Sequence, residues 1–315
     1  RHAGAKLAKP VLLLAPAASM NGYTSASTAL KVRGLKQTTP CRPALCVFAD
    51  PDAAAQAPLR MTAAGVADFL SKCSSSTDWR AAHFLRGGYF CERPREFFED
   101  TQDRLLDAAP RVPAGDIEAV AVVLDALLLS GLSMVVAGSS APASGGEHLI
   151  SHYLDMKSAL YGTPHDLHGT QVGVATVHCL GLWERILALN PDDLDVDALA
   201  DARPTDEEVR RIIEEDWGPV APEVLLQWDE KRLDRDALRA ELTCLREGLP
   251  RLRDALARDL LPRNTVANAI RAAGGPVDPD GLGVPPAEYR KALQRARYIR
   301  NRFTVLDLAA ELRLD

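Results

Sequence analysis

The sequence predicts a small α/β segment followed by a much larger all-helical region. Two short apolar runs, VLLLA at residues 11–15 and ALCVFA at 44–49, each end at a proline-containing turn, which is typical of buried strands in a parallel sheet. Alanine and leucine are abundant and aromatic residues make up only 5% of the chain, which favours helices. After Pro58 the apolar residues follow helical periodicity. We therefore predict an α/β domain over residues 1–57 and a helical domain over 58–315.

The segments around the two predicted strands are short and polar. Residues 1–10, RHAGAKLAKP, are typical of the end of a helix that leads into the first strand, so we expect a further segment before Arg1. Residues 16–28, PAASMNGYTSAST, predict a loop that opens into a helix.

Periodicity in the remainder predicts helices and two connectors, with no internal repeat and no further strand. The helices are expected at 59–72, 94–109, 116–137, 145–160, 172–189, 206–216, 222–249, 249–261, 263–273, 285–299 and 304–312. The acidic stretch 191–206 is expected to be a solvated surface loop, and 276–283 a turn-rich connector.

The most apolar run, residues 119–137, approaches the length of a membrane span. Asp125 lies in its middle, and Ser130, Gly131 and Ser133 follow it. We interpret this run as a buried helix in a soluble core and expect no membrane span.

Charge and cysteine usage exclude other classes of protein. The chain carries 37 basic and 43 acidic residues, a net charge of −6, and no run of five basic residues, which argues against nucleic-acid binding. Its six cysteines are scattered and form no CxxC pair, which favours reduced thiols in a cytoplasmic protein.

Four of the seven histidines lie between residues 148 and 168. His148 and His152 are four apart and would share one face of a helix. His168 stands where a short loop, 161–167, enters the next helix. Two antiparallel helices joined in this way could bring a histidine of the first to His168, as in metal sites between facing helices. The competing interpretation is a set of exposed or structurally satisfied histidines.

Asp68 is a candidate third ligand. A catalytic zinc site uses three protein ligands and keeps one open position. The carboxylate of Asp68 lies in a helix of small and apolar residues, MTAAGVADFLSK, where it is costly to bury unless it is paired or bound. The alternative is an ion pair with Lys72, one helical turn later, on a solvated face.

The loop after the first strand is a candidate ligand site. Loops at the carboxyl ends of parallel strands commonly bind ligands. Small residues in ASMNGYTSAS would let a ligand approach the backbone, and hydrogen bonds are available from Ser19, Asn21, Thr24 and Ser25. An ordinary polar loop is the alternative.

Three segments, in order, resemble the glycerol-1-phosphate dehydrogenase family of the iron-containing alcohol dehydrogenase and dehydroquinate synthase-like superfamily. They are APAASMNGYTS, then PLRMTAAGVADFLSK followed by TDWR, then SGLSM…GSSAPASGGEHLISHYLDM…HGTQVGVAT. The resemblance spans roughly residues 9–180. It implies a dehydroquinate synthase-like fold, in which residues 1–57 are part of a Rossmann-like NAD(P) domain and 58–315 form the helical metal-binding domain.

The resemblance also implies roles for the candidate residues. Asp68, His148 and His168 would hold the metal, and His152 would stand beside them or face the substrate, with His165 further out. The cofactor and substrate loop would comprise Ala17, Ser19, Asn21, Thr24 and Ser25, with Asn21 in a catalytic position where many relatives carry aspartate.

The implied reaction reduces dihydroxyacetone phosphate to sn-glycerol 1-phosphate with NADH or NADPH, or converts a related polyol. Hydride transfer to a ketone builds negative charge on the carbonyl oxygen, which a Lewis-acidic metal stabilises. One carboxylate and two imidazoles suit Zn²⁺, and also Ni²⁺ or Fe²⁺. We expect a cytoplasmic homo-oligomer that acts on a small molecule.

Two departures keep other interpretations open. First, no glycine-rich phosphate loop of the GGG type with a following aspartate precedes the strand at residue 11, and such a loop would bind the cofactor pyrophosphate. Second, Ala141 stands where relatives carry arginine, a residue suited to binding the phosphate of a substrate. One alternative is a truncated or degenerate non-catalytic relative that keeps the metal site. Another is a dehydroquinate synthase-like lyase, for which no supporting pattern of basic residues is present.

Overall fold

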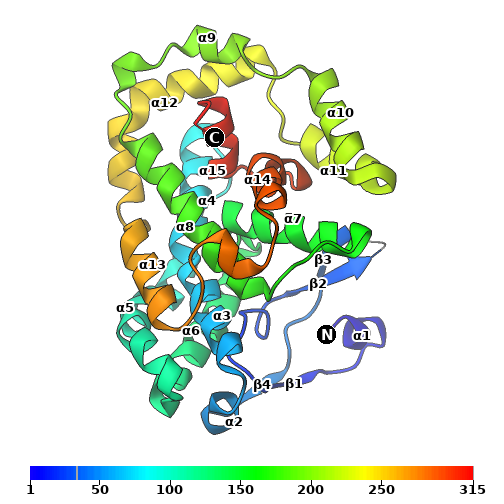
Figure 1. The fold of residues 1–315 in the computed structure, drawn as a ribbon, viewed down its shortest axis with the longest axis vertical. Coiled ribbons are helices and arrows are strands. Elements are labelled where there is room, and N and C mark those ends of the chain that lie inside the picture. The colour runs from blue at the N-terminus through cyan, green and yellow to red at the C-terminus, as the bar shows by residue number, and fades with distance from the viewer. Residues whose placement is uncertain (33–34, 315) are drawn as a thin grey trace.

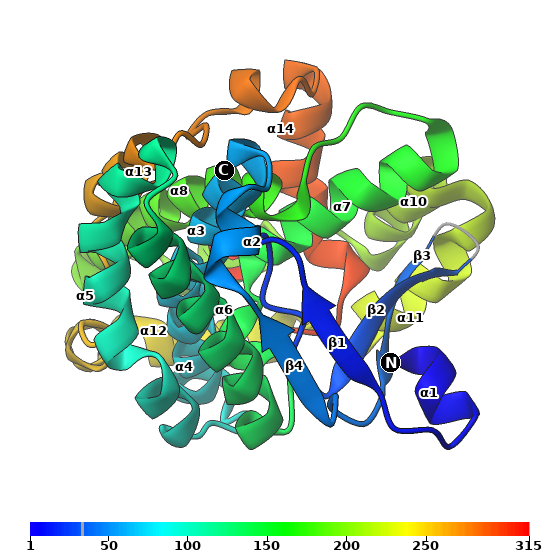
Figure 2. The same ribbon diagram turned by 90° about the horizontal axis from the view of Figure 1, so that it is seen from below.

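The structure, a computed structural model, describes residues 1–32 and 35–314. Figures 1 and 2 show the strands gathered near the N-terminus, with helices making up the rest of the described chain. β1 (Leu12–Ala15) pairs in parallel with β4 (Cys46–Ala49), with Leu12 opposite Cys46 and Ala15 opposite Ala49. Both predicted strands are therefore confirmed.

The loop after β1 does not open into a helix, and that expectation was wrong. It leads into β2 (Ser27–Val32), which pairs with β3 (Leu35–Pro40) in an antiparallel sheet of its own. Threonine and valine recur through STALKV and LKQTTP, and these β-branched residues favour an extended backbone. The small residues that suggested a helix start end at Ala26.

Two short helices, α1 (His2–Lys6) and α2 (Pro51–Ala55), flank the parallel strands, and the other helices follow along the chain. These others are α3 (Leu59–Leu70), α4 (Lys72–Arg86), α5 (Glu99–Ala108), α6 (Ile117–Ala137), α7 (Gly146–Tyr161), α8 (His168–Leu187), α9 (Val196–Asp201), α10 (Asp206–Trp217), α11 (Ala221–Asp229), α12 (Arg235–Leu256), α13 (Arg263–Ala272), α14 (Pro286–Arg295) and α15 (Val305–Glu311).

Several of the predictions for helices and connectors were wrong. The predicted helix 222–249 is broken between α11 and α12, because Asp234 caps α12 by accepting a hydrogen bond from the N–H of Ala237 at 2.8 Å. α12 then continues through Pro250, past the boundary expected at residue 249. The stretch 191–206 contains the short helix α9, and α4 was not predicted beyond Lys72.

Two large clusters of buried apolar side chains form most of the core of the described residues, and α8 contributes to both. One cluster surrounds Trp183 and Trp217 among α7, α8, α10, α12 and α14, and the other fills the space between α3, α5, α6 and α13. Helix α8 packs on both α3 and α7 where the clusters meet. This junction holds the predicted metal ligands.

Helix α6 is the one helix of the described residues that is long and apolar enough to cross a membrane, but half of its most apolar stretch is buried inside the protein. It packs on α3 and α5. Asp125 is exposed and lies 3.8 Å from Arg104. Helix α6 is therefore buried in the core along one side, and the prediction of a buried helix is confirmed for that side only.

The stability of the protein should fall in mild acid because of His178 on α8. Burial, reinforced by Arg263 and Arg185, lowers the pKa of His178 to about 4 from its usual 6.5. The unfolded chain binds the proton more readily, so stability is present above pH 6.5 and is lost as the pH falls from 6.5 toward 4. Between pH 7 and pH 5 we expect a loss of about 1–2 kcal/mol from this residue. Urea unfolding at both pH values should show a smaller difference in His178→Gln; an equal difference would contradict the assignment.

Candidate metal centre

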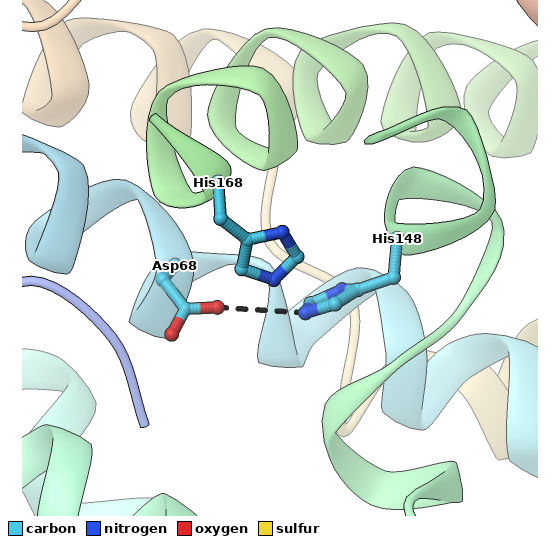
Figure 3. A group of neighbouring side chains, drawn as sticks. All are labelled: Asp68, His148 and His168. Atoms are coloured by element: carbon cyan, nitrogen blue, oxygen red, sulfur yellow. Dashed lines mark ion pairs between the residues drawn. The ribbon is translucent and has the colours of Figure 1, made fainter. Parts of the chain in front are cut away.

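Three helices bring Asp68, His148 and His168 into one centre. Each residue offers a ligand atom, and these atoms lie within 4.8 Å of one another. Figure 3 shows the two imidazoles and the carboxylate converging from α7, α8 and α3. Asp68 is fully buried and His148 is 4% exposed, so the centre lies inside the protein.

The close approach of α8 to α3 sets the position of His168, the first residue of α8. The next residue, Gly169, lies directly on the backbone of α3: a Cβ built on it would be 2.1 Å from the carbonyl oxygen of Ala64. Only glycine allows the start of α8 to come this near to Asp68 one turn further along α3. The glycine in HGTQVG is therefore part of how the centre is built.

The carboxylate of Asp68 is held on both oxygens. The backbone N–H of Asn21 donates to Oδ2 at 2.8 Å, and His148 Nε2 lies 3.5 Å from Oδ1. Lys72 Nζ lies 3.5 Å from the same Oδ1 and donates to the Asp68 carbonyl oxygen at 2.6 Å. Burial opposes ionisation, but Lys72, His148 and His168 together hold the pKa of Asp68 below its usual range. The residue is an anion at neutral pH.

The alternative interpretation of Asp68 was half right. The pairing with Lys72 exists, but both side chains are fully inaccessible to solvent, not on a solvated face. A buried lysine beside the candidate ligand is a feature that periodicity alone does not reveal.

The orientation of each imidazole is set by a residue that the sequence did not single out. Glu147 Oε1 accepts the Nδ1–H of His148 at 2.8 Å, which directs Nε2 toward Asp68. Burial alone would raise the pKa of Glu147, but His148 and the N–H of Gly145 lower it, so it remains a carboxylate. Ser151 Oγ lies 3.0 Å from His168 Nδ1. The only sequence signal was the acidic residue next to a histidine in SGGEH.

His152 and His165 differ sharply in their surroundings. The ring of His152 stacks on that of His168, with centroids 5.7 Å apart, and lies edge-on to His148 at 6.0 Å. It also lines a cavity of about 130 Å³. His165 is exposed and lies against Ser158, so it does not join the group.

The loop after β1 meets the centre through Asn21. In addition to the bond to Asp68, the Asn21 side-chain amide donates to Ser130 Oγ on α6 at 3.1 Å. Thr24 Oγ1 donates to the carbonyl of Leu128 at 2.7 Å, and Ser25 is buried with its hydroxyl on the carbonyl of Ser27.

Two further predicted loop residues lie near Tyr23. Ala17 is buried and its carbonyl accepts a hydrogen bond from the Tyr23 hydroxyl, while Ser19 is partly exposed. The hydroxyls of Thr24 and Ser25 thus anchor the loop, whereas Ser19 is partly exposed.

Packing of this loop on α3 should be sensitive to one glycine. A Cβ on Gly65 would lie 2.0 Å from the carbonyl oxygen of Ala18. We expect Gly65→Ala to displace the loop and to destabilise the protein by about 1–3 kcal/mol, as overpacked substitutions do. A Cβ on Gly88 would have no neighbour closer than 3.8 Å, so Gly88→Ala is the control. Equal thermal unfolding of the two variants would contradict this account.

The donor set fits a divalent transition metal. Two imidazoles and one carboxylate are a common catalytic ligand set that keeps an open position for substrate. The outer hydrogen bonds from Glu147, Ser151 and Asn21 are of the kind that orient such ligands. A larger cavity, of about 730 Å³ beside Trp228 and Tyr298, is not lined by any of the candidate ligands.

Comparison with known proteins agrees with this fold. A family model described as iron-containing alcohol dehydrogenase matches residues 1–58. The solved alcohol dehydrogenase from Oenococcus oeni superposes with a TM-score of 0.52 at 13% identity, over 97% of this chain and 65% of that one. The fold is therefore the dehydroquinate synthase-like fold of the iron-containing alcohol dehydrogenases.

Curated relatives narrow the assignment. Glycerol-1-phosphate dehydrogenase [NAD(P)+] from Geobacillus thermodenitrificans is 31% identical over 71% of this chain and 61% of its own length. The protein of the same name from Geobacillus stearothermophilus is 28% identical over 99% of this chain and 68% of its own length. The chain is thus similar to glycerol-1-phosphate dehydrogenases, and it spans 61% and 68% of the length of these two relatives.

Proposed function

We propose that the protein is a metal-dependent NAD(P) oxidoreductase that interconverts dihydroxyacetone phosphate and sn-glycerol 1-phosphate. The observation that supports this most directly is the convergence of Asp68, His148 and His168 in a chain similar to glycerol-1-phosphate dehydrogenases. We further propose that the protein is a cytoplasmic homo-oligomer. In each subunit, residues 1–57 would contribute to the cofactor domain and residues 58–315 would form the metal-binding domain.

A divalent cation bound by Asp68, His148 and His168 would supply Lewis-acid stabilisation of charge on the substrate oxygen. Zn²⁺, Ni²⁺ and Fe²⁺ all suit one carboxylate and two imidazoles. The surroundings support a bound cation, because Asp68 is held ionised and His148 is held by Glu147 with Nε2 toward the centre.

The protein residues around the centre keep the reacting groups in place. Glu147 and Ser151 hold the two imidazoles in fixed orientations, and Asn21 fixes one oxygen of Asp68 through its backbone N–H. The other oxygen, Oδ1, faces His148. Such preorganisation means that little rearrangement is needed when charge develops on the substrate.

We assign His152 to proton transfer. Its ring lies against both candidate ligand histidines and also lines the adjoining cavity. A histidine in that position can carry a proton between the substrate oxygen and the cavity at neutral pH. In the direction of reduction, NADH or NADPH would supply the hydride when bound, and His152 would deliver the proton to the carbonyl oxygen.

The exposed edge of the loop 17–25 is our candidate contact for the nicotinamide end of the cofactor. It follows the carboxyl end of β1 and touches Asp68 through Asn21. A cofactor there would lie against one side of the centre, leaving the side of His152 for the substrate.

Activity with the purified protein tests this function. The protein, loaded separately with Zn²⁺, Ni²⁺ or Fe²⁺, should oxidise NADH or NADPH in the presence of dihydroxyacetone phosphate. Stereospecific assay of the product should give sn-glycerol 1-phosphate. A protein that binds metal but transfers no hydride would support the alternative of a non-catalytic relative, and turnover of a phosphorylated carbocycle without net oxidation would support the lyase.

A further inference from the structure

A small polar cavity adjoins the candidate metal centre on the side of His152. It has a volume of about 130 Å³ and lies between α7, the segment 140–144 and the segment 300–302. All its lining side chains except Leu149 are polar, and two of them are arginines, Arg300 and Arg302. The volume equals that of about four water molecules at ~30 Å³ each, which suits one phosphate group and is too small for a nucleotide.

Arg302 is fixed by neutral partners. Its guanidinium donates to the carbonyl oxygen of Ser144 and to Ser140 Oγ, the latter at 2.9 Å. Among residues 1–32 and 35–314, no carboxylate lies within 4.0 Å of this guanidinium. A guanidinium has five N–H donors, so these two bonds leave donors for a ligand. The Arg302 guanidinium is therefore held in position by hydrogen bonds, but no carboxylate in contact with it neutralises its charge.

A second positive charge lies in the same cavity. Arg300 lines it from two residues away, and burial lowers the pKa of Arg300. Burial, reinforced by Arg300, lowers the pKa of Arg302 to about 10, so Arg302 remains charged at neutral pH. Arginine side chains in general keep their charge in proteins. Two like charges around one small cavity repel each other, and an anion between them relieves that repulsion.

The cavity is connected to the reaction centre through His152. This side chain lines the cavity, and its ring stacks on His168 with centroids 5.7 Å apart. A small molecule with an anionic group in the cavity would therefore have its remaining atoms beside the candidate ligands.

We propose that this cavity is the anion subsite of the protein and that Arg302 and Arg300 bind the phosphate group of the substrate there. The identity of the substrate rests on the function proposed above, whereas the binding of phosphate to the cavity does not. Arginine suits this role because its planar fork donates two parallel hydrogen bonds to phosphate oxygens.

Calorimetric titration with inorganic phosphate tests the subsite without any activity. We expect Arg302→Met and Arg300→Met each to weaken phosphate binding about 10-fold or more, and Arg302→Lys, which keeps the charge but lacks the fork, to be intermediate. Arg271→Met is the matched control, because Arg271 is exposed on α13 and bonded to Asn268. Phosphate affinity in both methionine variants within twofold of the wild type, with folding intact by circular dichroism, would overturn the proposal.

Steady-state kinetics then distinguishes a substrate phosphate from free phosphate. We expect Arg302→Met to raise KM for dihydroxyacetone phosphate about 10-fold or more while KM for unphosphorylated dihydroxyacetone stays unchanged. Inorganic phosphate should compete with dihydroxyacetone phosphate in the wild type. Phosphate that binds without competing would overturn the substrate assignment. If no substrate is turned over, the proposed function fails, and the titration still decides whether the cavity binds phosphate.

Discussion

His148→Ala should remove the bound metal and lower kcat/KM for dihydroxyacetone phosphate by about 1,000-fold or more, which corresponds to ~4 kcal/mol of transition-state stabilisation. His148 Nε2 lies 3.5 Å from Asp68 Oδ1, so it is one of three ligand atoms in the centre, and two ligands hold a catalytic cation poorly. Metal content by mass spectrometry and NADH oxidation measure the two effects separately. A chelator should reproduce the loss in the wild type.

The matched control is His165→Ala. His165 belongs to the same cluster in the sequence but is exposed and lies against Ser158, so metal content and kcat/KM should stay at wild-type values. The metal content and kcat/KM of Glu147→Gln should lie between those of His148→Ala and His165→Ala. Loss of a residue that orients a metal-bound histidine typically lowers metal affinity or activity about 10–100-fold. Retention of metal and activity by His148→Ala would exclude the proposed centre.

The candidate ligands could be picked from the sequence because each breaks a local pattern. Histidines are rare in this chain, so four in one stretch stand out, and Asp68 is a carboxylate in an otherwise small and apolar helix. Lys72, Glu147 and Ser151 could not be picked in the same way. Their importance depends on burial and on distances across helices, such as Glu147 Oε1 to His148 Nδ1, which appear only once α3, α7 and α8 are packed.

The fold was predictable to a similar degree and for a similar reason. Long periodic stretches such as α6 and α10 begin and end at strong capping signals, and both were predicted close to their observed bounds. The hairpin of β2 and β3 was missed because its strands form a sheet apart from the predicted parallel pair. The break before α12 was missed because helical periodicity continues across it. The only local signal of the break is Asp234, which caps the N-terminus of α12.

The segment around Ala141 shows what a single position cannot reveal. The absence of an arginine there suggested weak phosphate recognition. In the structure, Arg302 reaches Ser140 and Ser144, on either side of Ala141, from the distant C-terminal segment. No local pattern links residues so far apart along the chain.

Asp78→Ala should destabilise the protein by about 3–5 kcal/mol, a large part of the stability of an ordinary domain. Asp78 is 1% exposed and accepts three hydrogen bonds from three different segments. Trp183 Nε1 on α8 and the N–H of Val305 donate to Oδ1 at 2.8 and 3.1 Å, and the N–H of Gly146 donates to Oδ2 at 2.8 Å. Alanine would leave three buried donors without an acceptor, each costing about 1–3 kcal/mol, while relieving the repulsion from Glu147.

Asp78→Asn separates the acceptor role from the charge. Burial and the Glu147 carboxylate raise the pKa of Asp78, so a neutral side chain of the same shape should cost less than alanine does. The asparagine oxygen can still accept from Trp183 and Val305, and only the bond from Gly146 is lost. The urea midpoint of unfolding should therefore be highest for the wild type, lower for Asp78→Asn and lowest for Asp78→Ala. Asp125 is an exposed carboxylate, so Asp125→Ala is the control and should unfold at the wild-type midpoint. Because Gly146 begins the helix that carries His148, Asp78→Ala should also weaken metal binding by the protein that remains folded. If Asp78→Ala were as stable as the wild type, the hydrogen bonds of Asp78 to these three segments would not be what holds the centre together.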